Sequence, residues 1–219
     1  MPLAVAEIIA AKRSTLADGA AACESVQEII NIAATAEALA VTALGAALQN
    51  AAGGTLALNA EQQQALRAAR AEEQAHYVFL IGAGATPLTT TFTVPDPAIM
   101  TDVPTFLKTL IILEEIFIAA YLAAAQEFAL LGEPTLVQRA LAIASVEAGH
   151  RVAVRSFAID AGVLTGLPND IAFEKASFTR VGDAAATLKN GGFIGGSGTP
   201  LSYPGPGAID TTGVKNLTP

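Results

Sequence analysis

The sequence predicts an all-α protein, a bundle of four long helices arranged as two helical hairpins with a long crossover between them. Three observations support this fold class. First, 52% of the 219 residues are hydrophobic, only 5% are aromatic and Trp is absent, and a composition rich in Ala and Leu favours closely packed helices. Second, long helical stretches end at breaks that contain Gly and Pro. Third, the middle break is long enough to cross the length of a bundle.

The first hairpin is expected from the N-terminal part of the chain. A short helix is expected over residues 4–14, and a long helix then runs from about Ala21 to Asn50. That helix ends before Gly53-Gly54, because glycine is common just after a helix C-terminus. Asn59 is a candidate N-cap for the second long helix, which continues to about Ile81.

The second hairpin follows a Thr- and Pro-rich crossover over residues 85–102, which contains a possible extended piece at 91–94. Asp102-Val103-Pro104 has the pattern of an N-cap followed by an early proline, so a third helix is expected from there to about Leu131. Gly132-Glu133-Pro134 is then a tight connection to a fourth helix, which ends at Ala161-Gly162.

The domain organisation expected from these elements has two parts. Residues 1–163 form the bundle with the short N-terminal helix, and residues 164–219 form a loop-rich C-terminal extension. Gly191-Gly192 and Pro204-Gly205-Pro206-Gly207 mark this Gly/Pro-rich tail, for which disorder and wrapping around the bundle are both open.

Charge and cysteine content exclude several classes of function. The net charge of −8 argues against nucleic acid or an anionic membrane as a partner. The single cysteine, Cys23, excludes an intrachain disulfide and a Cys-rich zinc site, and is expected to be a small buried helical residue.

The most membrane-like run, Phe106 to Ala125, contains Lys108, Glu114 and Glu115, so a buried helix of a soluble bundle is the better interpretation. The N-terminus lacks a signal-peptide pattern, which predicts a cytoplasmic protein unless a native leader has been removed.

Two motifs carry the chemistry of this chain, Glu73-Gln74-Ala75-His76 and Glu147-Ala148-Gly149-His150, and they contain both of its histidines. Residues three apart share a face of a helix, so each motif directs a carboxylate and an imidazole the same way. With 13 Glu in the chain, both histidines would have a Glu three residues earlier roughly once in 280 by chance. A lone His is usually a core residue, but the repeated pattern predicts a dinuclear metal site.

Such a site needs one further carboxylate from each of the other two helices. Glu37 lies 14 residues before Ala51 and Glu73 lies 14 residues after Asn59, so the two should be level in an antiparallel hairpin. Glu24 and Glu28 lie 13 and 9 residues further from the turn, and are expected to be solvated surface acids.

On the third helix Glu114 shares its face with apolar residues, whereas Glu115 is on the side of Lys108. Glu114 is therefore the predicted ligand and Glu115 a nearby supporting or interface acid, with the reverse assignment left open. Glu72 is an alternative to Glu73, but only Glu73 keeps the spacing of the second motif. The predicted ligands are Glu37, Glu73, His76, Glu114, Glu147 and His150.

This donor set favours two iron or manganese ions and tolerates zinc, because it offers carboxylate oxygen and imidazole nitrogen without thiolate. Glu73 and Glu147 are expected to bridge the ions, with one His on each. Tyr77 and Tyr121 are close enough in sequence to support the ligands by hydrogen bonds or to act as redox-active phenols, with core packing as the simpler role.

The ligand pattern resembles that of the ferritin-like superfamily, and the chain is similar to the bacterial ferritin-like domain family that includes the desiccation-related proteins. The resemblance covers residues 20–165 and rests on Asn31 to Glu37, on Leu113-Glu114-Glu115 with Ala120-Tyr121, and on the two Glu-x-x-His motifs. It implies a ferritin-like four-helix bundle with a dinuclear iron or manganese centre. Family members often have an acid and a Tyr where this chain has Ala40 and Leu44, which puts chemistry that needs that tyrosine in question.

Three functions remain open from the sequence. The first is a redox enzyme, ferroxidase-, catalase- or oxidase-like, that acts on oxygen or peroxide. The second is a structural or desiccation-protection protein that a metal stabilises without turnover. The third is a metal-free helical module whose buried carboxylates pair with Arg70 or Arg151. A storage cage is not expected, because the Gly/Pro-rich tail replaces a C-terminal helix, while the apolar third helix predicts a homodimer.

Overall fold

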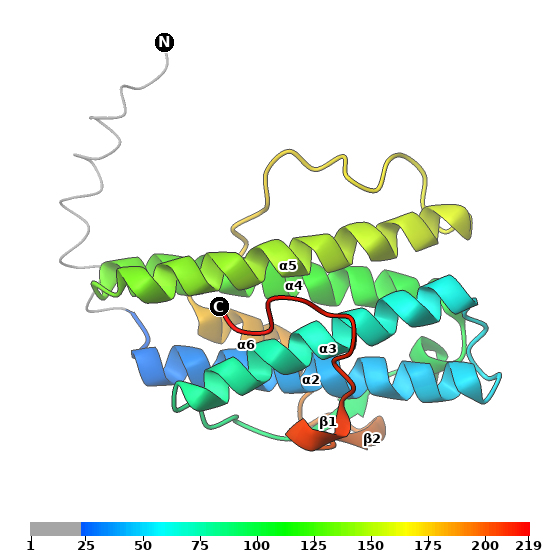
Figure 1. Cartoon of the computed structure of the whole chain (residues 1–219), viewed down its shortest axis with the longest axis horizontal. Coiled ribbons are helices and arrows are strands. Elements are labelled where there is room, and N and C mark those ends of the chain that lie inside the picture. Colours follow the sequence, from blue (N-terminus) through cyan, green and yellow to red (C-terminus); the bar gives the residue numbers. More distant parts are fainter. Residues whose placement is uncertain (1–22) are drawn as a thin grey trace, which may run out of the picture.

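Four long helices lie side by side in the computed structural model, which describes residues 23–219 (Figure 1). They are α2 (Val26–Ala52), α3 (Ala60–Gly82), α4 (Val103–Leu130) and α5 (Pro134–Asp160). The helix α2 packs mainly on α3, and α4 on α5, so the bundle consists of two hairpins. The predicted all-α bundle is therefore confirmed, while the short helix expected over residues 4–14 lies outside the described residues.

Side-chain caps determine where three of these helices begin. Ser25 and Glu28 form a capping box, in which each side chain accepts a hydrogen bond from the other residue's backbone N–H. This box makes α2 begin at Val26 rather than near Ala21. Asn59 caps α3 and Asp102 caps α4 in the same way that the sequence predicts, with hydrogen bonds from the N–H groups of Gln62 and Thr105.

The crossover between the hairpins contains the predicted extended piece as β1 (Thr91–Val94), followed by the 3-10 helix η1 (Pro97–Met100). The partner of β1 is the antiparallel strand β2 (Thr199–Ser202), in a register that places Thr91 opposite Ser202. Phe92 and Val94 are buried, so alternate residues of β1 enter the core. The C-terminal extension is thereby attached to the bundle.

The extension also contains α6 (Val181–Asn190), a helix that the sequence analysis did not predict. Val181, Ala184 and Leu188 form its buried face, which packs against α4 and α2. The extension thus wraps the bundle over α6 and β2, and ends with the short 3-10 helix η2 (Pro206–Ala208) and a segment that runs to Pro219.

The docking of α6 corrects two expectations about the start of α2. Glu24 is half-buried rather than solvated, because its carboxylate accepts hydrogen bonds from the backbone N–H of Gly182 in α6, the shorter at 2.9 Å. Cys23 is half-buried and precedes α2, so it is not a helical residue. Glu28 is exposed, as expected.

Two clusters of buried apolar side chains fill the bundle, one at each end. The first contains Ile29, Phe117 and Ile143, and the second contains Leu44, Leu107 and Val154. By length and hydropathy α2 is the one helix of residues 23–219 that could cross a membrane, but 72% of its most apolar window is buried inside the bundle. The apolar character of α2 is thus accounted for by its place in the core.

Candidate metal centre

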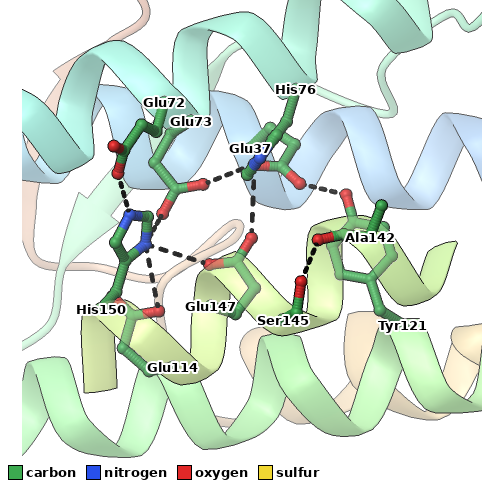
Figure 2. Close-up of polar contacts among 10 residues, drawn as sticks. All are labelled: Glu37, Glu72, Glu73, His76, Glu114, Tyr121, Ala142, Ser145, Glu147 and His150. Carbon is green, nitrogen blue, oxygen red and sulfur yellow. Dashed lines mark hydrogen bonds and ion pairs between the residues drawn. The ribbon is translucent and has the colours of Figure 1, made fainter. Parts of the chain in front are cut away.

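Six polar side chains from all four long helices point toward one another at the junction of the two apolar clusters (Figure 2). Their positions follow from the register of each hairpin and from the spacing of three within each motif. The four carboxylates are almost completely buried, each with at most 2% of its surface exposed. The structure therefore brings together all six residues that the sequence selects: Glu37, Glu73, His76, Glu114, Glu147 and His150.

One half of the cluster surrounds His76. Its Nδ1 atom lies 3.5 Å from Glu37 Oε2, 3.3 Å from Glu73 Oε2 and 3.4 Å from Glu147 Oε1. In this group of four residues, one potential ligand atom from each lies within 4.8 Å of all the others. Such spacing is suited to a single cation at the centre of the group.

The other half surrounds His150. Its Nδ1 atom lies 3.3 Å from Glu73 Oε1, 3.3 Å from Glu147 Oε2 and 3.9 Å from Glu114 Oε2. Glu73 and Glu147 thus contribute one oxygen to each half, while Glu37 and Glu114 each belong to one half. The cluster has an approximate twofold symmetry that relates the two hairpins.

Several atoms of this cluster are buried without a hydrogen-bond partner. They are Glu37 Oε2, Glu73 Oε1, Glu114 Oε2, both carboxylate oxygens of Glu147, and His150 Nδ1. A buried polar atom without a partner lowers the stability of the fold, so these atoms favour binding of a cation in the cluster. The donor set of four carboxylates and two imidazoles fits divalent cations well.

Glu127 on α4 is a buried carboxylate with a structural role, and backbone N–H groups provide its hydrogen bonds. It is 1% exposed, and it accepts hydrogen bonds from the backbone N–H groups of Glu24 at 2.8 Å and Val181 at 2.9 Å. Glu37 and Glu114 receive no backbone hydrogen bond among the described residues. Among the buried carboxylates of residues 23–219, burial alone therefore does not distinguish the site, whereas the unpaired oxygens do.

The electrostatics of the site show how strongly it attracts positive charge. Burial and the neighbouring charge of Glu73 raise the pKa of Glu37 to about 8. Burial also raises the pKa of Glu114 well above its usual range. Burial opposes ionisation of Glu147 too, but the close imidazoles of His150 and His76 outweigh it and lower the pKa of that carboxyl. The surrounding carboxylates likewise overcome burial and raise the pKa values of both histidines.

The three predicted supporting residues have different outcomes. Tyr121 is buried and its hydroxyl donates a hydrogen bond to Glu37, so it supports the cluster directly. Tyr77 is buried and its ring packs on that of Tyr203, with 4.6 Å between centroids, and no hydrogen bond joins it to the cluster among residues 23–219. Glu115 is exposed, because a step of one residue rotates a side chain about 100° around the helix, so it points away from the cluster, and its role as an interface acid stays a prediction.

Sequence reasoning missed a role for Glu72. Its Oε2 atom lies 2.7 Å from His150 Nε2, the ring nitrogen that faces away from the cluster, and its side chain is 34% exposed. Only its place next to Glu73 drew attention to it. Tyr203, which donates a hydrogen bond to Gln74, was missed as well, because it lies in the Gly/Pro-rich tail, 129 residues away in sequence.

The arginines expected in a metal-free module do not reach the cluster. The Arg70 guanidinium donates a hydrogen bond to the backbone oxygen of Val41 at 3.0 Å, and Arg151 pairs with Glu174, with 2.6 Å between Nη2 and Oε1. The proposed pairing of either arginine with the buried carboxylates is therefore wrong.

A comparison with known proteins agrees with the geometry of this site. The chain matches the family model described as ferritin-like domain over residues 25–159, a span that includes all six residues of the cluster. No curated protein and no solved structure matches the chain. Because the family match covers more than half of the 219 residues, the chain belongs to the ferritin-like domain family.

Proposed function

We propose that this protein holds two metal ions, iron or manganese, and uses them for redox chemistry with oxygen or peroxide. The observation that carries the proposal is the convergence of six donor residues, five of which have a buried atom without a hydrogen-bond partner. Glu37, Glu73, His76 and Glu147 would hold one ion, and Glu73, Glu114, Glu147 and His150 the other. Glu73 and Glu147 would then bridge the two.

The donor set supports this choice of metal. Four carboxylates balance the charge of two divalent ions, and oxygen with imidazole nitrogen suits iron and manganese while also tolerating zinc. Two such ions, when bound, would supply the electrons that reduction of oxygen or peroxide requires.

The chain's own residues contribute positioning and shielding. The Tyr121 hydroxyl directs one oxygen of Glu37 away from the cluster and leaves Oε2 facing His76. Glu72 fixes the ring of His150 through Nε2, so that Nδ1 faces the carboxylates. Apolar side chains above and below the cluster limit the access of water.

Metal analysis of protein purified without added metal tests the binding part of this proposal. We expect about two ions per chain, and loss of most of this metal in the double variant Glu73→Gln with Glu147→Gln. Glu115→Gln is the matched control, since Glu115 is an exposed acid on α4 and should leave the metal content unchanged. Metal-free protein with intact folding would overturn the proposal.

Kinetics then test the redox part. Protein loaded with iron, and separately with manganese, should consume oxygen or peroxide, and the double variant should not. Turnover by neither form would leave the metal site without a redox role.

A second candidate is a structural metal site without turnover. This candidate is favoured because each hairpin contributes three of the six side chains, so a bound ion would connect the two hairpins. This candidate predicts a large rise in melting temperature on metal binding together with no consumption of oxygen or peroxide.

A further inference from the structure

A pocket of about 360 Å³ lies between α3 and α5, directly beside the His150 half of the cluster. Its base is formed by Glu114 and His150, each with a buried inward atom that has no hydrogen-bond partner. Its other walls are mostly apolar, with Leu44 from α2, Leu110 from α4 and Phe157 from α5. All four long helices contribute to it, and its volume lies at the lower end of the range for small-ligand sites.

Small residues keep this pocket open. Gly149 lies within α5, where glycine lowers helix stability relative to alanine, yet a Cβ atom there would meet no heavy atom within 4 Å. Close packing therefore does not require this glycine. Ala68 and Ala69 on α3 and Ala153 on α5 line the same pocket, so both walls lack large side chains at this level.

The equivalent position on the other side of the cluster is bordered by the C-terminal segment. Ala75 precedes His76 as Gly149 precedes His150, and it lines a pocket of about 300 Å³. Residues 214–219 of the C-terminal segment also line that pocket, and Figure 1 shows this segment ending between α3 and α5. No residue of the described C-terminal extension lines the pocket beside His150. Of these two pockets, only the one beside His150 is lined by the four long helices alone.

The charged side chains around the pocket beside His150 indicate which class of ligand fits it. Glu72 and Glu114 are its acidic residues, and no Lys or Arg of residues 23–219 lines it. Apart from the His150 imidazole, a carboxylate or phosphate ligand would find no basic side chain there, in a chain whose net charge is −8. An uncharged apolar molecule would instead bury its surface against Leu44, Leu110 and Phe157.

We propose that the pocket lined by Gly149, Ala153 and Leu110 binds an uncharged apolar molecule with an alkyl chain or small ring, one end of which lies at Glu114 and His150. Only the role of this molecule depends on the proposed function. If the metal centre reacts with oxygen or peroxide, the bound molecule would be its second substrate. The binding itself depends on the pocket alone.

Fluorescence titration with N-phenyl-1-naphthylamine, an uncharged apolar probe, tests this proposal on the full chain, both as purified and after treatment with a chelator. We expect saturable binding that 1-octanol displaces and octanoate does not. Gly149→Leu and Ala153→Leu should each raise the dissociation constant at least about tenfold, because a leucine side chain occupies the pocket. Ala142→Leu is the matched control, since Ala142 is an exposed residue of α5 that lines the pocket beside His76, and it should keep the affinity of the unmodified protein.

The proposal is overturned if no saturable binding occurs, if both filling variants bind as the unmodified chain does, or if Ala142→Leu weakens binding more than they do. Displacement by octanoate as readily as by 1-octanol would overturn the preference for an uncharged ligand. Gly149→Leu replaces glycine by a better helix former, so a folding defect is not expected. Ala153→Leu tests the same pocket independently at a second position. Probe binding without oxygen or peroxide turnover would support the pocket and count against the redox function, whereas turnover without binding would do the reverse.

Discussion

The two imidazoles of the cluster differ in what their second ring nitrogen meets. His150 has Glu72 at 2.7 Å from Nε2, while the contacts of His76 with carboxylates all involve Nδ1. A carboxylate on the outer nitrogen of a histidine fixes the orientation of its ring and raises its basicity. Glu72 is therefore a positioning residue for the His150 half of the site.

Glu72→Ala is expected to weaken metal binding in this half by about 10- to 100-fold, as measured by competition with a chelator. The unfolding free energy of the metal-free protein should change little, since Glu72 is partly exposed. The exposed Glu61 on the same helix is the control position. Equal metal affinities of Glu72→Ala and Glu61→Ala would show that Glu72 has no positioning role.

Tyr121→Phe removes the one hydrogen bond that Glu37 receives from a described hydroxyl group. The variant leaves a buried oxygen of Glu37 unpaired, so the free energy of unfolding of the metal-free protein should fall by about 1–3 kcal/mol in urea titrations. Tyr77→Phe is the matched control, because Tyr77 is also buried but its hydroxyl has no hydrogen-bond partner among residues 23–219. A similar loss in both variants would assign the effect to packing instead.

The residues of the cluster could be predicted because each obeys a local rule. Spacing of three within a helix selects Glu73 with His76, and distance from the hairpin turn selects Glu37. Glu72 could not be assigned, because its contact with His150 crosses from α3 to α5 and depends on how the two hairpins dock.

Elements of the fold that depend on local sequence could also be predicted, whereas elements that depend on contacts with distant residues could not. The long helices could be predicted from caps and breaks such as Asn59 and Asp102, which act within one turn of the chain. Strand β2 could not, because its partner β1 lies about a hundred residues earlier and the surrounding segment is rich in Gly and Pro. The buried spacing of Val181, Ala184 and Leu188 in α6 is present in the sequence, but surrounding loop signals obscured it.

Glu127 fastens α6 to the bundle, and its removal tests how much this element contributes. Glu127→Ala would leave the buried N–H of Val181 and the N–H of Glu24 without their acceptor. We expect a loss of about 3 kcal/mol in the free energy of unfolding, together with faster hydrogen exchange at these two amides. Glu115→Ala is the control, an exposed acid on the same helix that should change the free energy by no more than about 0.5 kcal/mol.

At the scale of the whole molecule, the apolar residues of α4 are mostly used within the chain. Leu107, Phe117 and Ile118 are buried in the bundle, while Ile112 is 55% exposed. The predicted homodimer therefore has less exposed apolar surface on α4 than the sequence alone indicates. It stays a prediction, for which light scattering of the full chain is the measurement.

The cluster also determines how the two hairpins depend on each other. Each hairpin contributes two carboxylates and one imidazole, and α3 and α5 contact each other far less than α2 contacts α3 or α4 contacts α5. Bound metal would therefore connect halves that are otherwise joined mainly through the apolar core. A ligand that binds only the folded state stabilises it by an amount that grows with its concentration over its dissociation constant.

Metal loading should accordingly raise the free energy of unfolding by about 4 kcal/mol for each bound ion when free metal exceeds its dissociation constant a thousandfold. Thermal unfolding with and without a chelator measures this difference, and hydrogen exchange should slow on the facing sides of both hairpins together. The variant with Glu73→Gln and Glu147→Gln should melt at one temperature whether or not metal is present, because both carboxylates shared by the two halves of the cluster are lost. Protection confined to a single hairpin would mean that the metal does not join them, and the shared role of Glu73 and Glu147 would then be wrong.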